Sequence, residues 1–444
     1  MPTRMRVVVV LGLGLFRRRA NRESTLADPF ASLNIPAYRA FWISLLASYV
    51  AMSMNIVTRG YLAYLITGSA TALGVVSLAR GLSMLVMSPL AGVVADKVNK
   101  KLLLVVSQTV LMLIAIITSL LVHFHVIQLW HLVVLALVEG TVFTFNMPTR
   151  QAILPQLVPQ ERLANAIALN ASGRNLTRIV GPSLAGVAIG ISALGISGAF
   201  DLVAIAYFIA TILLIRLETL GETAASPATR RSESRGLSAL GDGFRYILNR
   251  PSLRLLIILG FVPVVLGNPY QTLLPVFQVR VLNIDATGLG MLYGAAGVGG
   301  LIGSIVVATL AEHPRKATIQ LIFGVIFGVG LLLFSLVHVF VIDLLFLAAV
   351  GLAGDGYSTL NSTMVMLNTD RAWYGRVMGV YMMNWSLMPL ATLPLGALAD
   401  LIGAPPTVSI ASAIIVALLI WVALFYPAYR TVTDAEPGVT LAGG

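Results

Sequence analysis

The sequence predicts an all-α membrane protein whose twelve transmembrane helices form two pseudo-symmetric six-helix bundles around a central cavity. Three observations predict this fold. The composition is too apolar for a soluble protein, twelve apolar runs are each long enough to cross a bilayer, and one long polar break divides these runs into two sets of six.

The composition sets the class of protein. Of the 444 residues, 58% are hydrophobic and only 11% are charged, whereas a soluble domain has about 25% charged residues. Too few polar residues remain to cover a water-exposed surface, so we expect the lipid bilayer to surround this chain. The sequence contains no cysteine, which excludes disulfides and thiolate metal sites.

The twelve apolar runs follow one another with mostly short connections. Each has roughly the 20 residues that a transmembrane helix needs. They cover residues 40–66, 72–95, 102–122, 127–147, 165–191, 196–216, 254–275, 287–310, 317–337, 339–361, 377–398 and 406–426.

Lysine and arginine residues indicate the orientation of these runs. All but five of the 29 Lys and Arg residues lie in tails and loops that share one side of the membrane if the N-terminus is cytoplasmic. Positively charged loops stay in the cytoplasm, so we expect both termini there. The exceptions are Arg280, on the outer side, and the in-span residues Arg59, Arg80, Arg174 and Arg178. This placement of the +11 net charge argues against a nucleic-acid partner.

The polar break between the two sets of runs divides the chain into parts. It is rich in serine and arginine, which is typical of a flexible basic linker, and Gly241 to Arg250 is predicted to form a short amphipathic helix on the cytoplasmic membrane surface. We expect a cytosolic N-terminal tail at 1–38, a first six-helix bundle at 39–216, the linker at 217–250, a second six-helix bundle at 251–427 and a cytosolic C-terminal tail at 428–444.

A weak repeat relates the two halves. In the fourth run Glu139 precedes a glycine and Asn146 lies at the inner end, and in the tenth run Asp355 precedes a glycine and Asn361 lies at the inner end. Many transporters are built from duplicated six-helix units around a central site. The repeat therefore favours a transporter with two related halves.

The loop between the second and third runs contains a glycine, an aspartate four positions later and a cluster of lysines. These residues are Gly92, Asp96, Lys97, Lys100 and Lys101. In spacing, loop and side of the membrane they resemble the signature of the major facilitator superfamily, with Asn99 in place of the usual glycine. The resemblance implies an inner gate that Asp96 latches in one state by bonding neighbouring helix ends and cations. The alternative is an ordinary positively charged cytoplasmic loop.

A second motif lies in the fifth run, where Gly181-Pro182 is followed by Gly186. It resembles the antiporter motif of exporters in this superfamily, with Ala185 where a glycine is usual. Small residues let helices approach closely, and a proline bends a helix. The expected direction of transport depends on this motif. The alternative is the common use of glycine and proline in membrane helices.

A third, looser resemblance covers residues 36–427. The segment 145–151, the Leu154-Pro155 pair after it and the opening of the first run at 38–42 look like the branch that contains enterobactin and multidrug exporters. That branch implies proton-driven antiport of drugs, macrolides or siderophores. The sequence itself does not identify the cargo.

Charged residues inside the runs are costly in a bilayer and therefore indicate function. Glu139 lies near the middle of the fourth run, and Arg174 and Arg178 lie four residues apart on one face of the fifth. Because these runs are antiparallel neighbours, we expect Glu139 to pair with Arg174 or Arg178 near the cavity. Pairing favours the charged carboxylate and desolvation opposes it, so Glu139 is the leading candidate for a proton carrier. The alternative is a static ion pair.

The other charges in the runs are further candidates. Asp355 is the second candidate for proton coupling, although a position nearer the inner surface equally fits a hydrated gate residue. Asp201, near the outer end of the sixth run, fits an interfacial carboxylate better. Arg80 lies at mid-depth without a partner in its helix, and Arg59 is close enough to the outside to snorkel. Four arginines against three carboxylates suit neutral or anionic cargo better than cationic cargo.

These features predict a plasma-membrane exporter of a bacterium that moves small molecules by rocking its two bundles, with protons as the coupling ion and a monomer as the acting unit. No G-x-x-x-x-G-K-[ST] phosphate loop occurs, which disfavours a primary pump. Neither H-E-x-x-H nor G-x-S-x-G occurs, which disfavours a membrane enzyme. We expect no cofactor and no metal. The alternatives are an uncoupled facilitator, an importer or a lipid flippase on the same fold.

Overall fold

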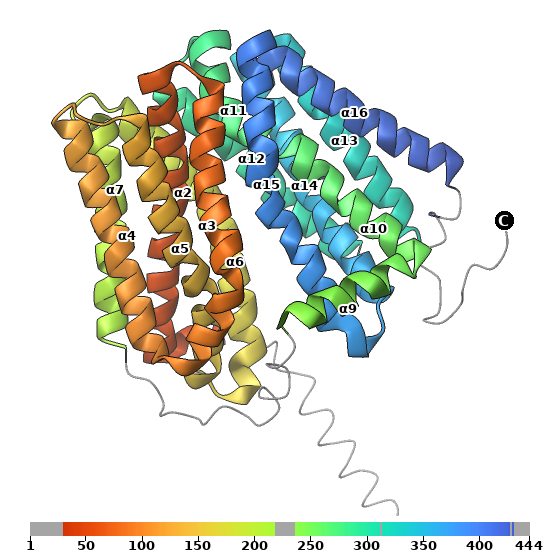
Figure 1. The fold of residues 1–444 in the computed structure, drawn as a ribbon, viewed down its shortest axis with the longest axis horizontal. Coiled ribbons are helices and arrows are strands. Elements are labelled where there is room, and N and C mark those ends of the chain that lie inside the picture. Colours follow the sequence, from red (N-terminus) through yellow and green to blue (C-terminus); the bar gives the residue numbers. More distant parts are fainter. Residues whose placement is uncertain (1–29, 218–235, 311–312, 427–428, 430–444) are drawn as a thin grey trace, which may run out of the picture.

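The computed structural model describes residues 30–217, 236–310, 313–426 and 429, and these residues form two helical bundles that lie side by side (Figure 1). The first bundle contains α2 (Pro36–Thr67), α3 (Ala70–Lys97), α4 (Lys100–His123), α5 (Leu129–Ile153), α6 (Leu163–Gly190) and α7 (Gly195–Ile215). The second contains α10 (Pro251–Val262), η5 (Pro263–Gly267), α11 (Tyr270–Val276), η6 (Phe277–Val281), α12 (Ala286–Thr309), α13 (Lys316–Val337), α14 (Phe340–Leu367), α15 (Tyr374–Ile402) and α16 (Ala404–Phe425). Short helices η1 (Ala31–Asn34), η2 (Leu154–Gln156), η3 (Gln160–Arg162) and η7 (Arg371–Trp373) and the linker helix α9 (Gly236–Leu248) complete the described chain.

The predicted fold class is confirmed. Each predicted run lies in its own helix, except the seventh, which is divided into α10, α11 and the π-helical turns η5 and η6. Among the described residues, eleven helical segments are long and apolar enough to cross a membrane on composition alone. The remaining segment, α6, is long enough, but two arginines and three asparagines make it more polar. A polar face on a spanning helix indicates that it borders other helices or a cavity rather than lipid alone.

Side chains next to the turns explain where several helices begin. Ser69 accepts a hydrogen bond from the backbone of Ala72 at the start of α3, and Asn99 accepts one from Leu102 at the start of α4. Both side chains satisfy a backbone donor that the first turn of a helix leaves free. Asn99, which departs from the usual pattern of its motif, therefore serves as the N-cap of α4.

The two bundles touch along two antiparallel helix pairs, α3 with α15 and α6 with α12. We call the end of the molecule at which α9 lies the α9 end, and the other the distal end (Figure 1). The bundles converge toward the distal end. There a Cβ on Gly186 would lie 2.5 Å from the Cα of Gly290, and one on Gly74 would lie 2.7 Å from the Cα of Leu393. Glycine therefore permits backbone-to-backbone contact between the bundles at this end.

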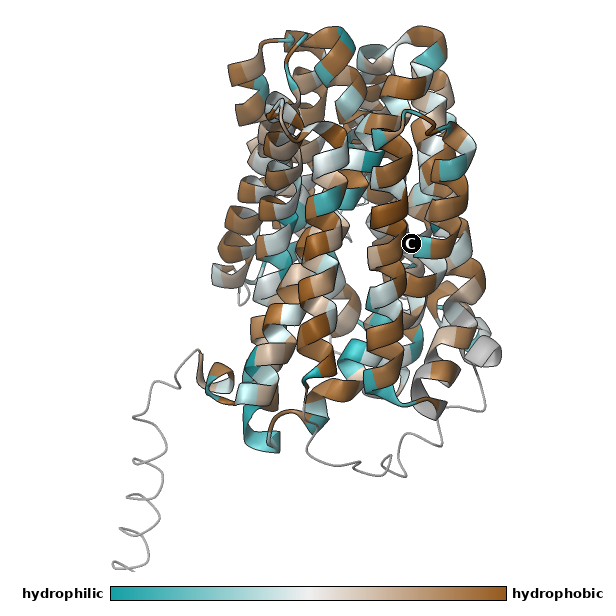
Figure 2. Ribbon diagram, turned by 90° about the vertical axis from the view of Figure 1, so that its left-hand side faces the viewer, coloured by the Kyte–Doolittle hydropathy of each residue, from teal (hydrophilic) through white to brown (hydrophobic). Residues whose placement is uncertain are grey.

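The outer surface of the bundles is apolar. Hydrophobic residues cover the helices along most of their length, and hydrophilic residues gather mainly toward the helix ends and at positions between helices (Figure 2). Large side chains such as Leu345 of α14 and Ile305 of α12 are more than half exposed. A surface of this kind is stable against lipid tails, because the helices satisfy their own backbone hydrogen bonds.

The helix α9 is fastened to the second bundle by a small polar and aromatic cluster. The ring of Tyr246 stacks on that of Trp373 with centroids 4.6 Å apart. The Tyr246 hydroxyl donates to Oδ2 of Asp370 at 2.9 Å, and Arg250 Nη2 pairs with the same oxygen at 2.7 Å. These bonds hold the residues before α15 against the end of the linker.

The two sides of α9 differ in exposure. Ile247 is buried against the bundle, whereas Phe244 and Leu248 are about half exposed. The helix begins at Gly236, five residues before the predicted start. The preceding part of the predicted linker and most of the two predicted tails lie outside the described residues.

We predict that the contact between α9 and Asp370 weakens in acid. The hydrogen bond from Tyr246 and the charge of Arg250 lower the pKa of Asp370 below its ordinary value of 3.8. A carboxylate with a lowered pKa stabilises the folded contact above the ordinary pKa, and this contribution is lost as the pH falls below it. A spin label on Arg245→Cys should become more mobile between about pH 5 and pH 3, and Asp370→Asn should give high mobility at neutral pH. Mobility that is the same at both pH values would contradict the role of Asp370.

Candidate functional site

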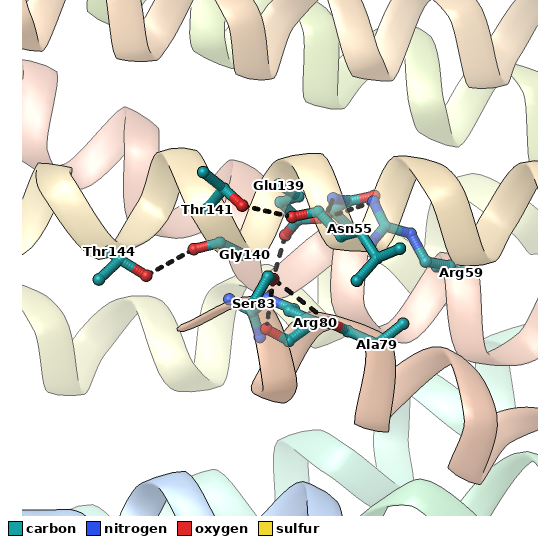
Figure 3. A network of polar contacts seen from close by, with 10 residues as sticks. Asn55, Arg59, Ala79, Arg80, Ser83, Glu139, Gly140, Thr141 and Thr144 are labelled. Carbon is teal, nitrogen blue, oxygen red and sulfur yellow. Dashed lines mark hydrogen bonds and ion pairs between the residues drawn. The ribbon is translucent and has the colours of Figure 1, made fainter. Parts of the chain in front are cut away.

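A buried carboxylate lies at the centre of the first bundle (Figure 3). Glu139 of α5 is only 1% exposed and Arg59 of α2 only 4%. Arg59 Nη2 forms an ion pair with Glu139 Oε2, and Asn55 Nδ2 donates to the same oxygen at 3.0 Å. Arg80 Nε of α3 lies 3.4 Å from Oε1. We call these four residues the Glu139 cluster, which joins three helices.

Local sequence explains how the cluster forms. Asn55 and Arg59 are four residues apart on α2 and therefore project from the same helical face. Next to Glu139, a Cβ on Gly140 would lie 2.3 Å from the carbonyl oxygen of Arg80, so only glycine lets α5 approach α3 this closely. Two positive charges thus surround one buried negative charge. An ionised carboxylate in such a place requires partners of this kind.

The prediction that Glu139 pairs with Arg174 or Arg178 is wrong. Helix α5 packs mainly against α3 and α4, whereas α6 packs against α2 and α12. Helices α5 and α6 follow each other in sequence but are not close neighbours in space. A similar depth in the membrane was therefore not enough to identify the partner of Glu139. Arg59 does not snorkel to the surface either, because its ion pair with Glu139 keeps it buried.

A second ion pair joins the two bundles. Arg178 Nη1 of α6 lies 3.1 Å from Oδ2 and 3.3 Å from Oδ1 of Asp355 on α14. The side chain of Arg178 is 52% exposed and that of Asp355 is 30% exposed. Asp355 lies near the middle of α14, so the prediction that it lies nearer the inner surface is wrong. This pair spans the boundary between the halves and is open to solvent.

Glycine on α12 makes room for the interbundle pair. A Cβ on Gly300 would lie 2.2 Å from Oδ2 of Asp355, so a larger residue there would displace the carboxylate. A small hollow surrounds the pair where α6, α12 and α14 meet. Its lining consists of Asn175, Arg178, Gly297, Gly300, Leu301, Ser304 and Asp355.

The two carboxylates therefore differ in what they can do chemically. Asp355 is partly exposed and pairs with a cation of the opposite bundle, so solvent reaches a contact that joins the two halves. Glu139 is enclosed by three polar partners of its own bundle and has almost no solvent contact.

The two remaining charged candidates within the helices, Arg174 and Asp201, take no part in these ion pairs among the described residues. None of the four ion pairs found among the described residues includes Arg174. It lies one turn from Arg178 on α6. Asp201 accepts a hydrogen bond from Ser119 Oγ at 2.6 Å, which is a contact within the first bundle near the distal end.

The structure describes only part of the predicted inner-gate motif. The backbone places Gly92, Asp96 and Lys97 in the last turns of α3, whereas the side chains of Asp96 and Lys97 lie outside what the structure describes. Lys100 is the first residue of α4, and Lys101 Nζ donates to the carbonyl oxygen of Leu217 at 2.8 Å. The latch role of Asp96 stays a prediction.

The antiporter-like motif in α6 packs against both bundles. A Cβ on Gly181 would lie 2.5 Å from the Cβ of Ser53 on α2, and one on Gly186 would meet Gly290 on α12 at the same distance. Pro182 is buried inside the helix. The small residues of this motif therefore let α6 pack closely against helices of both bundles.

Sequence reasoning missed two residues of these sites. Asn55 bonds Glu139, and its position one turn before Arg59 on an apolar helix was the available signal. Gly300 accommodates Asp355. No sequence signal distinguishes it from the other glycines of α12, because its role depends on the approach of α14.

Comparison with known proteins gives similar sequences among bacterial exporters. A sequence profile of the family described as transmembrane secretion effector matches residues 27–437. The staphyloferrin A transporter of Staphylococcus aureus is 27% identical over 343 residues, which are 77% of this chain and 84% of that protein. The enterobactin exporter EntS of Citrobacter koseri is 24% identical over 361 residues, 81% of this chain and 84% of that protein. Macrolide efflux protein A of Streptococcus pyogenes is 22% identical over 334 residues, 74% and 80% respectively.

Solved structures share the fold at low sequence identity. The nucleoside transporter NupG aligns with a TM-score of 0.68 at 12% identity, covering 88% of this chain and 99% of that one. A bacterial homologue of the human lysosomal transporter Spinster aligns with a TM-score of 0.68 at 12% identity, covering 89% and 96%. At this level of identity the similarity shows that the chain shares the fold of these two transporters.

We predict that Glu139→Gln strongly destabilises the protein. The change leaves Arg59 and Arg80 without their counter-charge in the core of the first bundle. Removing one partner of a buried pair costs about 3–5 kcal/mol. Thermal unfolding in detergent, followed by tryptophan fluorescence, should show a lower midpoint. Arg174→Gln serves as the control and should change stability by only about 0.5 kcal/mol. Equal midpoints for both variants would contradict the structural role of the Glu139 cluster.

We also predict that Gly186→Val prevents the bundles from closing at the distal end. The added side chain would meet the backbone of Gly290, which cannot move aside as a flexible side chain can. Cross-linking between cysteines placed on the distal ends of α6 and α12 should fall relative to the parent protein. Gly195→Val is not a suitable control because of its positive φ, whereas Gly60→Val is suitable because nothing lies near its Cβ position.

Proposed function

The chain belongs to the transmembrane secretion effector family of the major facilitator superfamily, and on that premise we propose that it exports small molecules by alternating access, driven by the inward movement of protons. The relatives named above are a staphyloferrin A transporter, an enterobactin exporter and a macrolide efflux protein. We propose cargo of the same general kind, a drug, macrolide or siderophore-like molecule.

The interbundle ion pair is the observation that supports proton coupling best. Only an ionised Asp355 attracts Arg178, so adding a proton to the carboxylate removes the attraction that joins α6 to α14. The pair lies midway along its helices and is reached by solvent. Proton binding there therefore changes how firmly the two bundles hold each other, which is the property that an alternating-access carrier must control.

This geometry reverses the ranking of Glu139 and Asp355 as candidates for proton coupling. We propose Asp355 as the proton carrier, because it is accessible and its partner belongs to the other bundle. We assign Glu139 a structural role, because all its partners belong to one bundle and move with it. A rigid first bundle can then rock as one body against the second.

The distribution of basic residues supports a direction for this motion. We propose that the α9 end is cytoplasmic, with both termini there and the protein in the bacterial plasma membrane as a monomer. The structure then represents a state closed on the outer side, where α6 meets α12 and α3 meets α15. Cargo enters from the cytoplasm near Arg178, Asn175 and Ser304. The Asp96 loop closes the cytoplasmic side in the opposite state.

A proton cycle completes the proposed mechanism. Asp355 takes a proton from the outer side after the cargo has left, and the pair with Arg178 opens. The protonated carrier returns to the state that faces the cytoplasm, Asp355 releases its proton there, and the ion pair forms again. The surplus of arginine around the bundle interface favours uncharged or anionic cargo over cationic cargo.

We predict that Asp355→Asn abolishes proton-driven transport. Inside-out vesicles with an acidic interior should take up cargo when they contain the parent protein, because their interior corresponds to the outside of the cell. We would follow a fluorescent dye, a macrolide and a catechol siderophore. Uptake by Asp355→Asn should fall to the level of vesicles that lack the protein, because the amide cannot carry a proton. Asp242→Asn makes the same chemical change at an exposed position on α9 and should leave uptake unchanged.

A second variant tests the position of the carboxylate without changing any charge. In Gly300→Ala the new methyl group displaces Asp355 from Arg178, and gradient-driven uptake should be reduced. Full uptake by Asp355→Asn would remove this residue from the mechanism. Uptake by the parent protein that does not depend on the gradient would indicate an uncoupled facilitator. Transport of none of the compounds by the parent protein would count against export of this cargo class.

A further inference from the structure

The turn between α2 and α3, at the distal end of the first bundle, receives two oppositely charged side chains from the second bundle. Gly68 ends α2 with a left-handed backbone, and Ser69 precedes the first residue of α3. Arg280, in the π-helical turn η6, contacts the first of these residues, and Asp400, near the end of α15, contacts the second.

Asp400 caps the beginning of α3 from outside its own bundle. Its Oδ1 accepts the backbone N–H of Ala70 at 2.7 Å, and its Oδ2 accepts that of Thr71 at 2.9 Å. The hydroxyls of Ser69 and Thr71 donate to Oδ2 at 2.5 and 2.6 Å. One carboxylate thus takes four donors of the first turn of a helix that belongs to the other half of the molecule.

Arg280 performs the opposite role at the end of α2. Its Nη2 donates to the carbonyl oxygen of Gly68 at 2.9 Å, and its guanidinium lies over the ring of Tyr64, 5.7 Å from the centroid. Like the carboxylate of Asp400, this guanidinium reaches from the second bundle to the first. The two contacts lie on either side of one tight turn.

The charges of Arg280 and Asp400 are opposite in sign to the partial charges of the helix ends that they contact. The last carbonyl groups of a helix carry partial negative charge and the first N–H groups carry partial positive charge. Arg280 meets the end of α2 and Asp400 meets the start of α3, so each charge has the favourable sign. Reversing either residue would place like charges together. This complementarity distinguishes the pair of contacts from incidental surface hydrogen bonds.

A glycine brings the second bundle close enough for these bonds. A Cβ on Gly396, one helical turn before Asp400, would lie 2.6 Å from the carbonyl oxygen of Ala70. The sequence Gly396-x-x-Ala399-Asp400 repeats the pattern Gly92-x-x-Ala95-Asp96. Because α3 and α15 are antiparallel partners, the same five-residue pattern lies at opposite ends of one helix pair. Asp400 therefore has a specific partner, the first turn of α3.

We propose that Arg280 and Asp400 form a clasp that holds the distal end closed, and that both must release the α2–α3 turn when this end opens. This inference rests on the alternating-access mechanism proposed above. The hydrogen bonds of the clasp lie at helix ends, where water can replace them when the clasp opens.

The experiment uses the absence of cysteine from the chain, because two introduced cysteines are then the only sites of labelling. Val126, in the turn between α4 and α5, and Val339, in the turn between α13 and α14, are exposed at the distal end, one in each bundle. Spin labels on Val126→Cys and Val339→Cys report the distance between the two bundles when they are measured by pulsed electron paramagnetic resonance. The parent protein, reconstituted in lipid nanodiscs, should give mainly the shorter distance.

Removing either charge should shift this distribution. Asp400→Asn loses the charged acceptor of four hydrogen bonds, and Arg280→Gln loses the cation at Gly68. We expect each change to raise the ratio of longer to shorter distances by at least about tenfold, in keeping with the loss of hydrogen bonds to a charged group. Asp242→Asn, the same chemical change at the α9 end, should leave the ratio as it is in the parent.

The possible outcomes separate the clasp from the mechanism on which it rests. If two distances are present but neither variant changes their ratio, the clasp is wrong and alternating access stands. If one distance persists in the parent and in both variants, at neutral and at acidic pH, the bundles do not move and both proposals fail. A shift in both variants, with an unchanged thermal unfolding midpoint, supports the clasp and excludes general destabilisation as the cause.

Discussion

A carboxylate buried among the helices of a membrane protein must be surrounded by groups that compensate its charge, because neither lipid nor water is there to do so. Glu139 meets this requirement through Arg59, Arg80 and Asn55, which come from two other helices. The cluster consequently ties α2, α3 and α5 to each other at mid-bundle. None of these three helices can shift alone without leaving a charge unpaired, which supports the proposal that the first bundle moves as one body. Rocking of one half against the other presupposes such a unit.

The environment of Asp355 in the second bundle is different. Its partner Arg178 belongs to the opposite bundle, and the pair is open to solvent. A buried charge held by its own bundle provides rigidity, whereas an accessible charge held by the other bundle provides a contact that can be broken.

The contacts at the two ends of the molecule also differ. At the distal end glycine contacts and the Arg280 and Asp400 side chains join the bundles directly. At the α9 end the linker helix α9 packs against α10 and α15 of the second bundle. Tyr246, Arg250 and Asp370 supply the polar and aromatic contacts there.

Composition and the lengths of the apolar runs by themselves predicted a membrane protein with twelve long helices in two sets of six, because the bilayer imposes a length and an apolarity that can be counted along the sequence. The motif around Gly92 and Asp96 was sufficient to predict membership of the major facilitator superfamily. The sequence also identified Glu139, Asp355 and Arg178 as costly charges, since cost depends on depth in the bilayer. It could not assign their partners, because depth does not say which way a side chain faces or which helices adjoin. Only the tertiary packing of the helices decided that Glu139 of α5 meets Arg59 of α2 and that Arg178 of α6 meets Asp355 of α14.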